Sequence, residues 1–223
     1  MTLRASWDRE AADWVRWARD PALDHWFWRV TLPALLDLVP PPKRLTVDVG
    51  CGEGRVAREL IARGHRVVGV EGSPALADAA RAADPSFEVH VADAAAMPLG
   101  DAVADAAVAS MSLLNMDDLD GVLREVARVL EPGGRFAFTI PHPSLSAKPL
   151  GDDPRAGDYF AEYEYAEVRE RGGLRMTFHD RHRPLERYFG ALEAAGLLVE
   201  ALREPRPEGR REPMFLAVRA LRP

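Results

Sequence analysis

The sequence predicts an α/β fold: a doubly wound, mostly parallel sheet of seven strands, with helices on both faces and an antiparallel hairpin at its end. A buried strand over residues 45–49 runs into a glycine-rich turn and then into a helix. Four more strands follow as far as residue 141, with helical patterns among them, as in parallel sheets. The last two strands are joined by a short turn, so they must be antiparallel neighbours.

Length and composition indicate one domain. The 223 residues suffice for a full core, so we treat 1–223 as one unit. A hydrophobic content of 47% and a charged content of 29% are typical of soluble globular proteins. The net charge of −6 argues against a nucleic-acid partner, and no apolar run indicates a membrane segment. We expect a cytoplasmic monomer or homodimer. The one cysteine, Cys51, excludes an internal disulfide framework.

The N-terminal segment, residues 1–40, is rich in tryptophan. Its five tryptophans are Trp7, Trp14, Trp17, Trp26 and Trp28. The first three fall on one face of a helix. That face either packs on the core or caps a ligand site, and the two interpretations are compatible. A second helix is expected from Asp24 to Leu38, where three prolines end it.

The glycine-rich turn is the strongest functional signal. Gly50, Gly52 and Gly54 permit positive φ and leave no Cβ, so a ligand can lie directly on the backbone. The helix behind the turn directs free N–H groups at that ligand. A dinucleotide fingerprint requires G-x-G-x-x-G, whereas the spacing here is G-x-G-x-G. Asp48 and Glu53 also make the loop acidic, which suits a cationic ligand better than a pyrophosphate.

Acidic residues end the next two strands. Glu71 closes the strand over 65–70, where an acid can accept hydrogen bonds from both ribose hydroxyls. A helix over 74–83 begins at a Ser-Pro start signal. The strand over 87–91 then leads to Asp93. The glutamate position is shared with NAD enzymes, but the second acid is generally absent from them.

The second half of the chain completes the sheet. A strand is expected over 104–110 and an amphipathic helix over 119–130, with Asp117 and Asp118 as its caps. Metal binding by these two residues and Asp120 is the disfavoured alternative, and we expect no metal. The remaining elements are expected within 131–141 (strand), 188–195 (helix), 197–202 (strand) and 213–221 (strand).

Three motifs carry a family resemblance. VDVGCGEGR, VADAAAMPL and LEPGGRF resemble class I S-adenosylmethionine-dependent methyltransferases, whose sheet is Rossmann-like. The resemblance covers about Leu45 to Pro223 except for an insert. It implies that Asp93 contacts the adenine amine and that the Ser110–Met111 backbone contacts the methionine moiety. The full set of implied cofactor contacts is Asp48, Gly50, Cys51, Gly52, Glu71, Gly72, Asp93, Ala94, Ser110 and Met111.

The insert, residues 142–183, is the expected substrate wall. It contains Tyr159, Tyr163 and Tyr165, and Gly172 with Gly173 lies between two alternating runs, which predicts a hairpin. An aromatic, loop-rich segment on a rigid sheet is a typical place for substrate specificity.

Methyl transfer from a sulfonium needs mostly positioning, but a hydroxyl or ammonium acceptor also needs a base. His142 and His179 are the candidate bases, because imidazole titrates near neutral pH. Each is alternatively a structural histidine. His182 as a further base and Tyr163 as a substrate contact are weaker candidates, and the H-R-P-L motif beginning at His182 is either catalytic or only a turn.

We therefore expect an enzyme that transfers a methyl group from S-adenosylmethionine to an O or N atom of a small organic molecule, leaving S-adenosylhomocysteine. The alternatives are a NAD-dependent oxidoreductase, a methyltransferase acting on a peptide or protein, and a non-catalytic cofactor-binding protein. Signatures of nucleic-acid methyltransferases are absent, since S-L-L-N stands where adenine-modifying enzymes carry N/D-P-P-Y.

Overall fold

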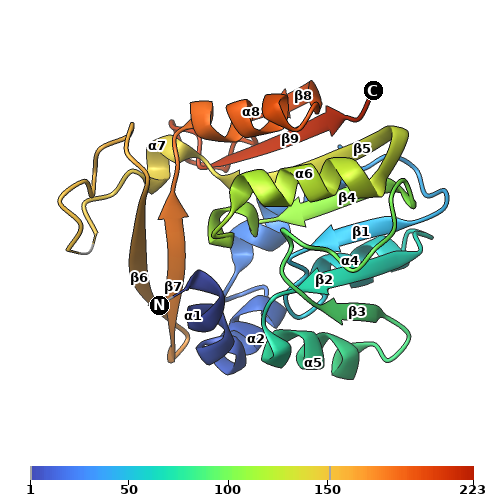
Figure 1. Cartoon of the computed structure of the whole chain (residues 1–223). Helices are drawn as coiled ribbons and strands as arrows, with labels where there is room; N and C mark the ends of the chain where they lie inside the picture. Colours follow the sequence, from blue (N-terminus) through green and yellow to red (C-terminus); the bar gives the residue numbers. More distant parts are fainter. Residues whose placement is uncertain (1, 151) are drawn as a thin grey trace.

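The computed structural model describes residues 2–150 and 152–223 (Figure 1). Its main sheet has seven strands in the order β3-β2-β1-β4-β5-β9-β8. The first five in this order are parallel, and β9 is antiparallel to both of its neighbours. The strands are β1 (Thr46–Val49), β2 (Val67–Glu71), β3 (Glu88–Val91), β4 (Ala104–Ser110), β5 (Leu130–Pro141), β8 (Leu198–Arg203) and β9 (Phe215–Leu221). The predicted fold class is confirmed.

The sheet separates two hydrophobic cores, because successive side chains of a strand point to opposite faces. In β5, Phe136 and Phe138 join the core on one face, whereas Ala137 joins the core on the other. In β4, Ala107 and Val108 divide in the same way. The central strands are therefore apolar on both sides, as expected for a parallel sheet covered by helices on both faces.

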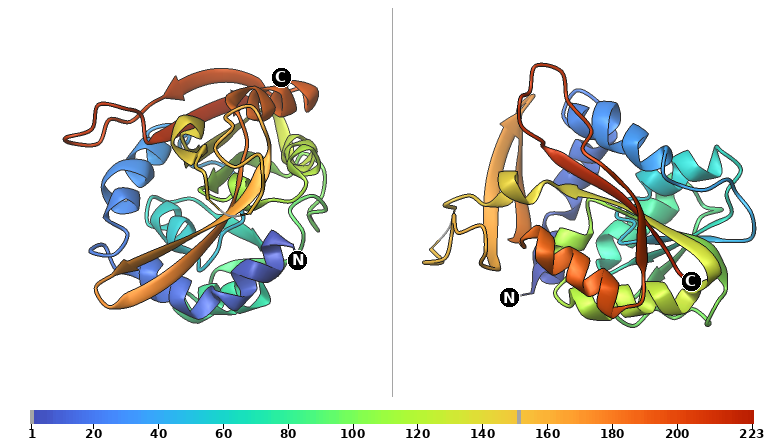
Figure 2. Two further views of the ribbon diagram at one scale, coloured as in Figure 1. Left: turned by 90° about the vertical axis from the view of Figure 1, so that its left-hand side faces the viewer. Right: turned by 90° about the horizontal axis from the view of Figure 1, so that it is seen from above.

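Helices cover both faces of the sheet (Figure 2). One core takes in α6 and α8, and the other takes in α3, α4 and α5. These helices are α3 (Leu32–Leu36), α4 (Arg55–Ile61), α5 (Pro74–Ala83), α6 (Leu119–Val129) and α8 (Leu185–Ala194). Among the described helices, none has the length and apolar character needed to cross a membrane.

Helix starts follow the capping signals of the sequence. The Ser73 side chain accepts a hydrogen bond from the Leu76 N–H at the start of α5. The Asp118 carboxylate accepts one from the Gly121 N–H at the start of α6, so the capping interpretation of Asp118 is confirmed. Helix α8 begins three residues before the predicted start, because Pro184 occupies its N-cap position with a suitable φ.

The N-terminal segment forms α1 (Leu3–Arg9) and α2 (Ala11–Arg19), followed by η1 (Phe27–Thr31) and α3. The continuous helix predicted from Asp24 to Leu38 is instead interrupted by the π-helical turn η1. Pro33 opens α3 and has no N–H to donate to the preceding turn, which accounts for the local widening.

The predicted insert hairpin is present. Strands β6 (Tyr163–Arg171) and β7 (Leu174–His182) pair antiparallel in a sheet of their own, after the short helix α7 (Pro143–Ser146). Gly172 and Gly173 form the turn with φ of +57° and +74°. The hairpin stands across the edge of the main sheet toward which the parallel strands point (Figure 1).

Candidate active site

A cavity of about 700 Å³ lies at the carboxyl ends of the parallel strands. This is the edge at which open α/β sheets bind ligands. The glycine loop and strand ends form its floor, and the N-terminal helices and the β6–β7 hairpin form its walls. The left view of Figure 2 looks toward this edge, where the hairpin crosses in front of the sheet. The cavity lining includes Asp48, Gly50, Cys51, Gly52, Glu71, Gly72, Asp93, Ala94, Ser110 and Met111.

The glycine loop could not hold larger residues. Gly50 has a φ of +69°, and a Cβ there would lie 2.7 Å from the Cβ of Ser112. Gly52 has a φ of +56°, and a Cβ there would lie 3.5 Å from the indole nitrogen of Trp14. Both positions have a left-handed backbone that favours glycine, and at Gly50 a Cβ would also clash, whereas the contact at Gly52 is of ordinary van der Waals length. The N-terminal helices accordingly lie directly over the loop.

Glu71 connects the end of β2 to the glycine loop. One of its carboxylate oxygens accepts a hydrogen bond from the Gly52 N–H at 2.7 Å, and the other accepts one from the Ser73 N–H at 2.8 Å. Burial raises the pKa of this carboxyl, although these hydrogen bonds oppose the shift. An acid held in this way presents two fixed acceptor oxygens at the cavity floor.

Asp48 is a buried acid without a full set of partners. It lies in β1, and its Oδ2 has no hydrogen-bond partner in the described structure. Burial, reinforced by the negative charge of Glu71, raises its pKa to about 7. A buried, unpaired carboxylate beside a cavity is costly unless a cation or a donor comes to it. A positively charged ligand on the cavity floor would therefore stabilise the Asp48 carboxylate.

The other predicted contacts lie around the same floor. The Asp93 carboxylate accepts a hydrogen bond from the Ala95 N–H, so it also shapes the turn after β3. Met111 has a φ of +55°, and its N–H donates to the Thr139 carbonyl. Ser110 and Met111, at the end of β4, both line the cavity. Burial raises the pKa of the Cys51 thiol well above its usual value, so it stays protonated.

Ion pairs attach the N-terminal helices to the floor. The Arg19 guanidinium lies 2.6 Å from the Glu53 carboxylate, and Arg55 lies 2.7 Å from Asp24. Ser73 donates a hydrogen bond to Asp8 at 2.5 Å. These pairings are not predicted above, because Arg55 is one of three charged residues in the short helix α4 and its sequence does not distinguish it from Arg58.

Aromatic side chains join the two walls. Phe178 of β7 makes edge-to-face contacts with Trp7, Trp14 and Trp17, at centroid distances of 5.5–6.3 Å. Such pairs add to the free energy of simple burial. Trp17 is buried in a core cluster and also lines the cavity, so the tryptophan face packs on the core, and its role as a cap over a ligand stays a prediction.

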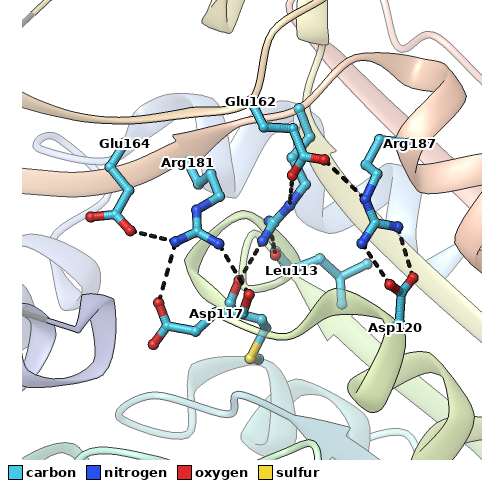
Figure 3. Close-up of polar contacts among 9 residues, drawn as sticks. Leu113, Asp117, Asp120, Glu162, Glu164, Arg181 and Arg187 are labelled. Carbon is cyan, nitrogen blue, oxygen red and sulfur yellow. Dashed lines mark hydrogen bonds and ion pairs between the residues drawn. The ribbon is translucent and has the colours of Figure 1, made fainter. Parts of the chain in front are cut away.

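Arginines fix the loop after β4 to the end of the hairpin. Arg183 donates to the carbonyls of Leu113 at 3.1 Å and Met116 at 2.6 Å, and it pairs with Glu162. Arg181 and Arg187 pair with acids on either side of it, and Figure 3 shows this arrangement. Arg183 is almost completely buried. The H-R-P-L motif therefore acts as a structural clamp on η2 (Leu113–Asn115).

The candidate bases lie elsewhere. Neither His142 nor His179 is among the described residues that line the cavity. His142 bonds Ser144 and lies 3.2 Å from Glu204, and His179 lies 3.5 Å from Glu10. His182 is buried between Ser146 and the Tyr159 carbonyl, and the Tyr163 hydroxyl donates to the Lys148 carbonyl. These four side chains support the insert, and their chemical roles stay untested predictions.

Known proteins resemble this chain over most of its length. A model of the methyltransferase domain matches residues 47–138. The ubiquinone/menaquinone biosynthesis C-methyltransferase UbiE of Caulobacter vibrioides is 33% identical over 198 residues, which cover 77% of this chain and 74% of that protein. The nocamycin O-methyltransferase of Saccharothrix syringae is 39% identical over 138 residues, covering 56% of this chain and 49% of that one. An S-adenosylmethionine-dependent methyltransferase of Mesorhizobium loti superposes with a TM-score of 0.70 and 27% identity, over 85% of this chain and 96% of that one.

The chain belongs to the S-adenosylmethionine-dependent methyltransferase family. The resemblance found in the three motifs is thereby confirmed, and the NAD-dependent oxidoreductase alternative is set aside. The site fits the cofactor of this family. The orphaned Oδ2 of Asp48 suits a cationic ligand, and Gly50 and Gly52 line the cavity with backbone that carries no side chain. Glu71 presents carboxylate oxygens at the end of β2.

Proposed function

We propose that this methyltransferase transfers a methyl group to an O or N atom of a small organic molecule bound in the cavity. One observation carries the proposal: the residues expected to contact the cofactor line the same cavity as the aromatic side chains of both walls. The cavity volume of about 700 Å³ falls within the range of roughly 300–1,000 Å³ typical of small-molecule sites.

The proposed cofactor contacts follow from position. Glu71 accepts from the ribose hydroxyls, and Asp93 lies near the adenine amine. Asp48 and the Gly50–Gly52 backbone lie beside the charged methionine moiety, and the Ser110–Met111 backbone completes that end. The complete proposed set also includes Cys51, Gly72 and Ala94.

The walls favour a small acceptor over a peptide or protein. A macromolecule would have to displace the N-terminal helices, which ion pairs and Trp14 hold over the glycine loop. The net charge of −6 does not favour nucleic acid. Of the two named relatives, one is a C-methyltransferase and the other an O-methyltransferase, so the acceptor atom needs its own measurement.

The chemical step requires mainly positioning from the protein. S-adenosylmethionine supplies an activated methyl group on a sulfonium. The floor residues hold that group in place, and the aromatic walls orient the acceptor and exclude water. Such positioning can lower a barrier by roughly 7–11 kcal/mol.

Calorimetric titration tests the cofactor assignment. The protein should bind S-adenosylmethionine and S-adenosylhomocysteine in the micromolar range and give no signal with NAD. Glu71→Ala should weaken binding about tenfold or more, because two fixed acceptors are lost. Glu88→Ala, at an exposed position of β3, serves as the control. Wild-type binding by Glu71→Ala would refute the ribose role.

A radiolabelled methyl group tests the acceptor. The enzyme is offered phenols, amines, carboxylic acids and a peptide library, and NMR of each product locates the new methyl group on O, N or C. Transfer to small O or N acceptors supports the proposal. Transfer to peptides alone, or to carbon alone, contradicts it.

A further inference from the structure

One acid in the cavity lies on the hairpin wall, opposite the cofactor residues. Asp180 belongs to β7, is buried, and lines the cavity. It shares the inward face of the hairpin with Phe178, two residues earlier. Asn115, which follows β4 in η2, donates its amide hydrogens to the Asp180 carboxylate at 2.8 Å and to the His179 carbonyl at 2.9 Å. This amide bridge fixes the carboxylate relative to the end of β4.

The second oxygen of Asp180 is available to a ligand. Within the described residues, Asn115 is the hydrogen-bond partner of the first oxygen, and no lysine, arginine or histidine forms an ion pair with the carboxylate. Three of the four described arginines that line the cavity are engaged elsewhere, and the fourth, Arg4, is exposed and lies beside Gly72 on the cofactor side. Arg55 pairs with Asp24, Arg169 pairs with Glu167, and Arg171 donates to the Leu23 carbonyl.

This distribution of charge selects the chemistry of the acceptor. An anionic acceptor would meet the Asp180 carboxylate, while the guanidinium groups on the same hairpin, Arg169 and Arg171, are already engaged. An acceptor with a neutral O–H or N–H group would instead satisfy the unpaired oxygen. The aromatic edges of Phe178, Trp7 and Trp14 match an apolar or aromatic body.

We propose that Asp180, oriented by Asn115, is the catalytic base that binds the hydroxyl or amine hydrogen of a neutral aromatic acceptor. This proposal rests on the proposed function. The acceptor O or N lone pair forms a bond to the methyl carbon, and the carbon–sulfur bond electrons return to sulfur. The acceptor proton passes to the Asp180 carboxylate, which later releases it to water. Methylated product, S-adenosylhomocysteine and one proton balance the step.

The surroundings of Asp180 suit a base that works near neutral pH. Burial raises its pKa to about 6, although the Asn115 hydrogen bond and the Arg169 charge oppose the shift. The titratable side chains that influence it are Tyr165, Glu167 and Arg169 of β6, its chain neighbour His179 on the other face of β7, and Tyr188 of α8. A base in this range can take the proton and release it again at physiological pH.

Asp180→Asn in the full chain tests the proposal, because asparagine keeps the shape and can still accept from Asn115. Glu170→Gln, at an exposed position of the same hairpin, is the matched control. Ligand-observed NMR of the S-adenosylhomocysteine complex measures the binding of four probes that share one ring: p-cresol, p-toluidine, 4-methylanisole and p-toluate.

The wild-type complex should bind p-cresol or p-toluidine about tenfold more tightly than 4-methylanisole, which has no hydrogen to donate. Asp180→Asn should abolish that preference, and Glu170→Gln should keep it. Both variants should retain wild-type affinity for S-adenosylhomocysteine. For any methylated probe, Asp180→Asn should lower the rate about 100-fold or more and remove its rise with pH near 6.

Three results would overturn the proposal: tighter wild-type binding of p-toluate or 4-methylanisole, an unchanged preference in Asp180→Asn, or equal loss of S-adenosylhomocysteine binding in that variant. Failure of the proposed function is seen separately, because wild-type protein would then bind no S-adenosylhomocysteine or methylate only peptides.

Discussion

The Arg19 guanidinium lies 2.6 Å from the Glu53 carboxylate, and this ion pair joins helix α2 to the glycine loop. The Glu53 side chain is completely buried, and Arg58 of α4 pairs with it from the other side at 2.7 Å. Glu53, in the middle of the loop, thus forms ion pairs with arginines from two different helices. Glu53 therefore links helix α2 to the glycine loop and to α4.

Glu53→Gln should therefore weaken both stability and cofactor binding. Because the arginines are partly exposed, we expect a loss of about 1–3 kcal/mol in the free energy of unfolding, below the cost of a fully buried pair. Affinity for S-adenosylhomocysteine should fall with it. Urea unfolding and calorimetry measure the two effects. Glu59→Gln, which removes a partly exposed helix pair with Arg63, should change neither. Equal changes in stability and affinity in Glu53→Gln and Glu59→Gln would contradict the link between the N-terminal helices and cofactor binding.

Asp48→Asn should change the pH dependence of stability. The folded-state pKa of about 7 lies above the usual 3.8, so the folded chain holds a proton that the unfolded chain has released. Stability therefore falls as pH rises from about 4 to about 7. Asp48→Asn lacks this loss. At pH 8 its free energy of unfolding should exceed that of the wild type by about 1–3 kcal/mol, whereas at pH 4 the two should differ little.

The same variant should bind S-adenosylmethionine about tenfold more weakly at pH 8, because a charge beside a cationic ligand is lost. Unfolding curves at both pH values and calorimetry provide the measurements. Asp37→Asn, at an exposed helix end, is the control and should show no such pH dependence. A wild-type stability that is flat between pH 4 and pH 8 would contradict the assignment.

Trp14 should report cofactor binding. Its indole nitrogen lies against the Gly52 backbone, so a ligand on the loop changes its surroundings. We expect S-adenosylhomocysteine to alter tryptophan fluorescence in the wild type and the change to be largely lost in Trp14→Phe. Trp28 is not among the described residues lining the cavity, so Trp28→Phe should keep the response. The reverse pattern would place the ligand elsewhere.

Arg183→Ala should destabilise the fold and loosen the loop after β4. It leaves the Leu113 and Met116 carbonyls without their buried donor and removes one of the two arginine partners of Glu162, which keeps Arg187. We expect a loss of about 3 kcal/mol or more in the free energy of unfolding. Arg175→Ala, at an exposed position of the same hairpin, should cost about 0.5 kcal/mol or less. Urea unfolding of the wild type and the two variants measures these free energies. Similar losses in Arg183→Ala and Arg175→Ala would refute the clamp.

Local patterns predicted the scaffold well. The glycine loop, the helix over 74–83 and the strand over 104–110 appear where the sequence indicated. Period-two apolar runs and capping residues act over a few neighbours, so the chain order itself contains the information. The expected helix over 24–38 is present over 25–36, but its turn at Phe27–Thr31 is π-helical, which the sequence pattern did not indicate.

The sheet, the acids at the strand ends and the family could be predicted from the sequence, since each depends on residues close together in the chain. Which groups face the acceptor side of the cavity became visible in the folded structure. His142 and His179, chosen for their chemistry, lie outside it, whereas Asp180 and Asn115 meet there across 65 positions of the chain. The reason is physical: the direction of a hairpin side chain depends on how the hairpin packs on the N-terminal helices, and that packing is a long-range property.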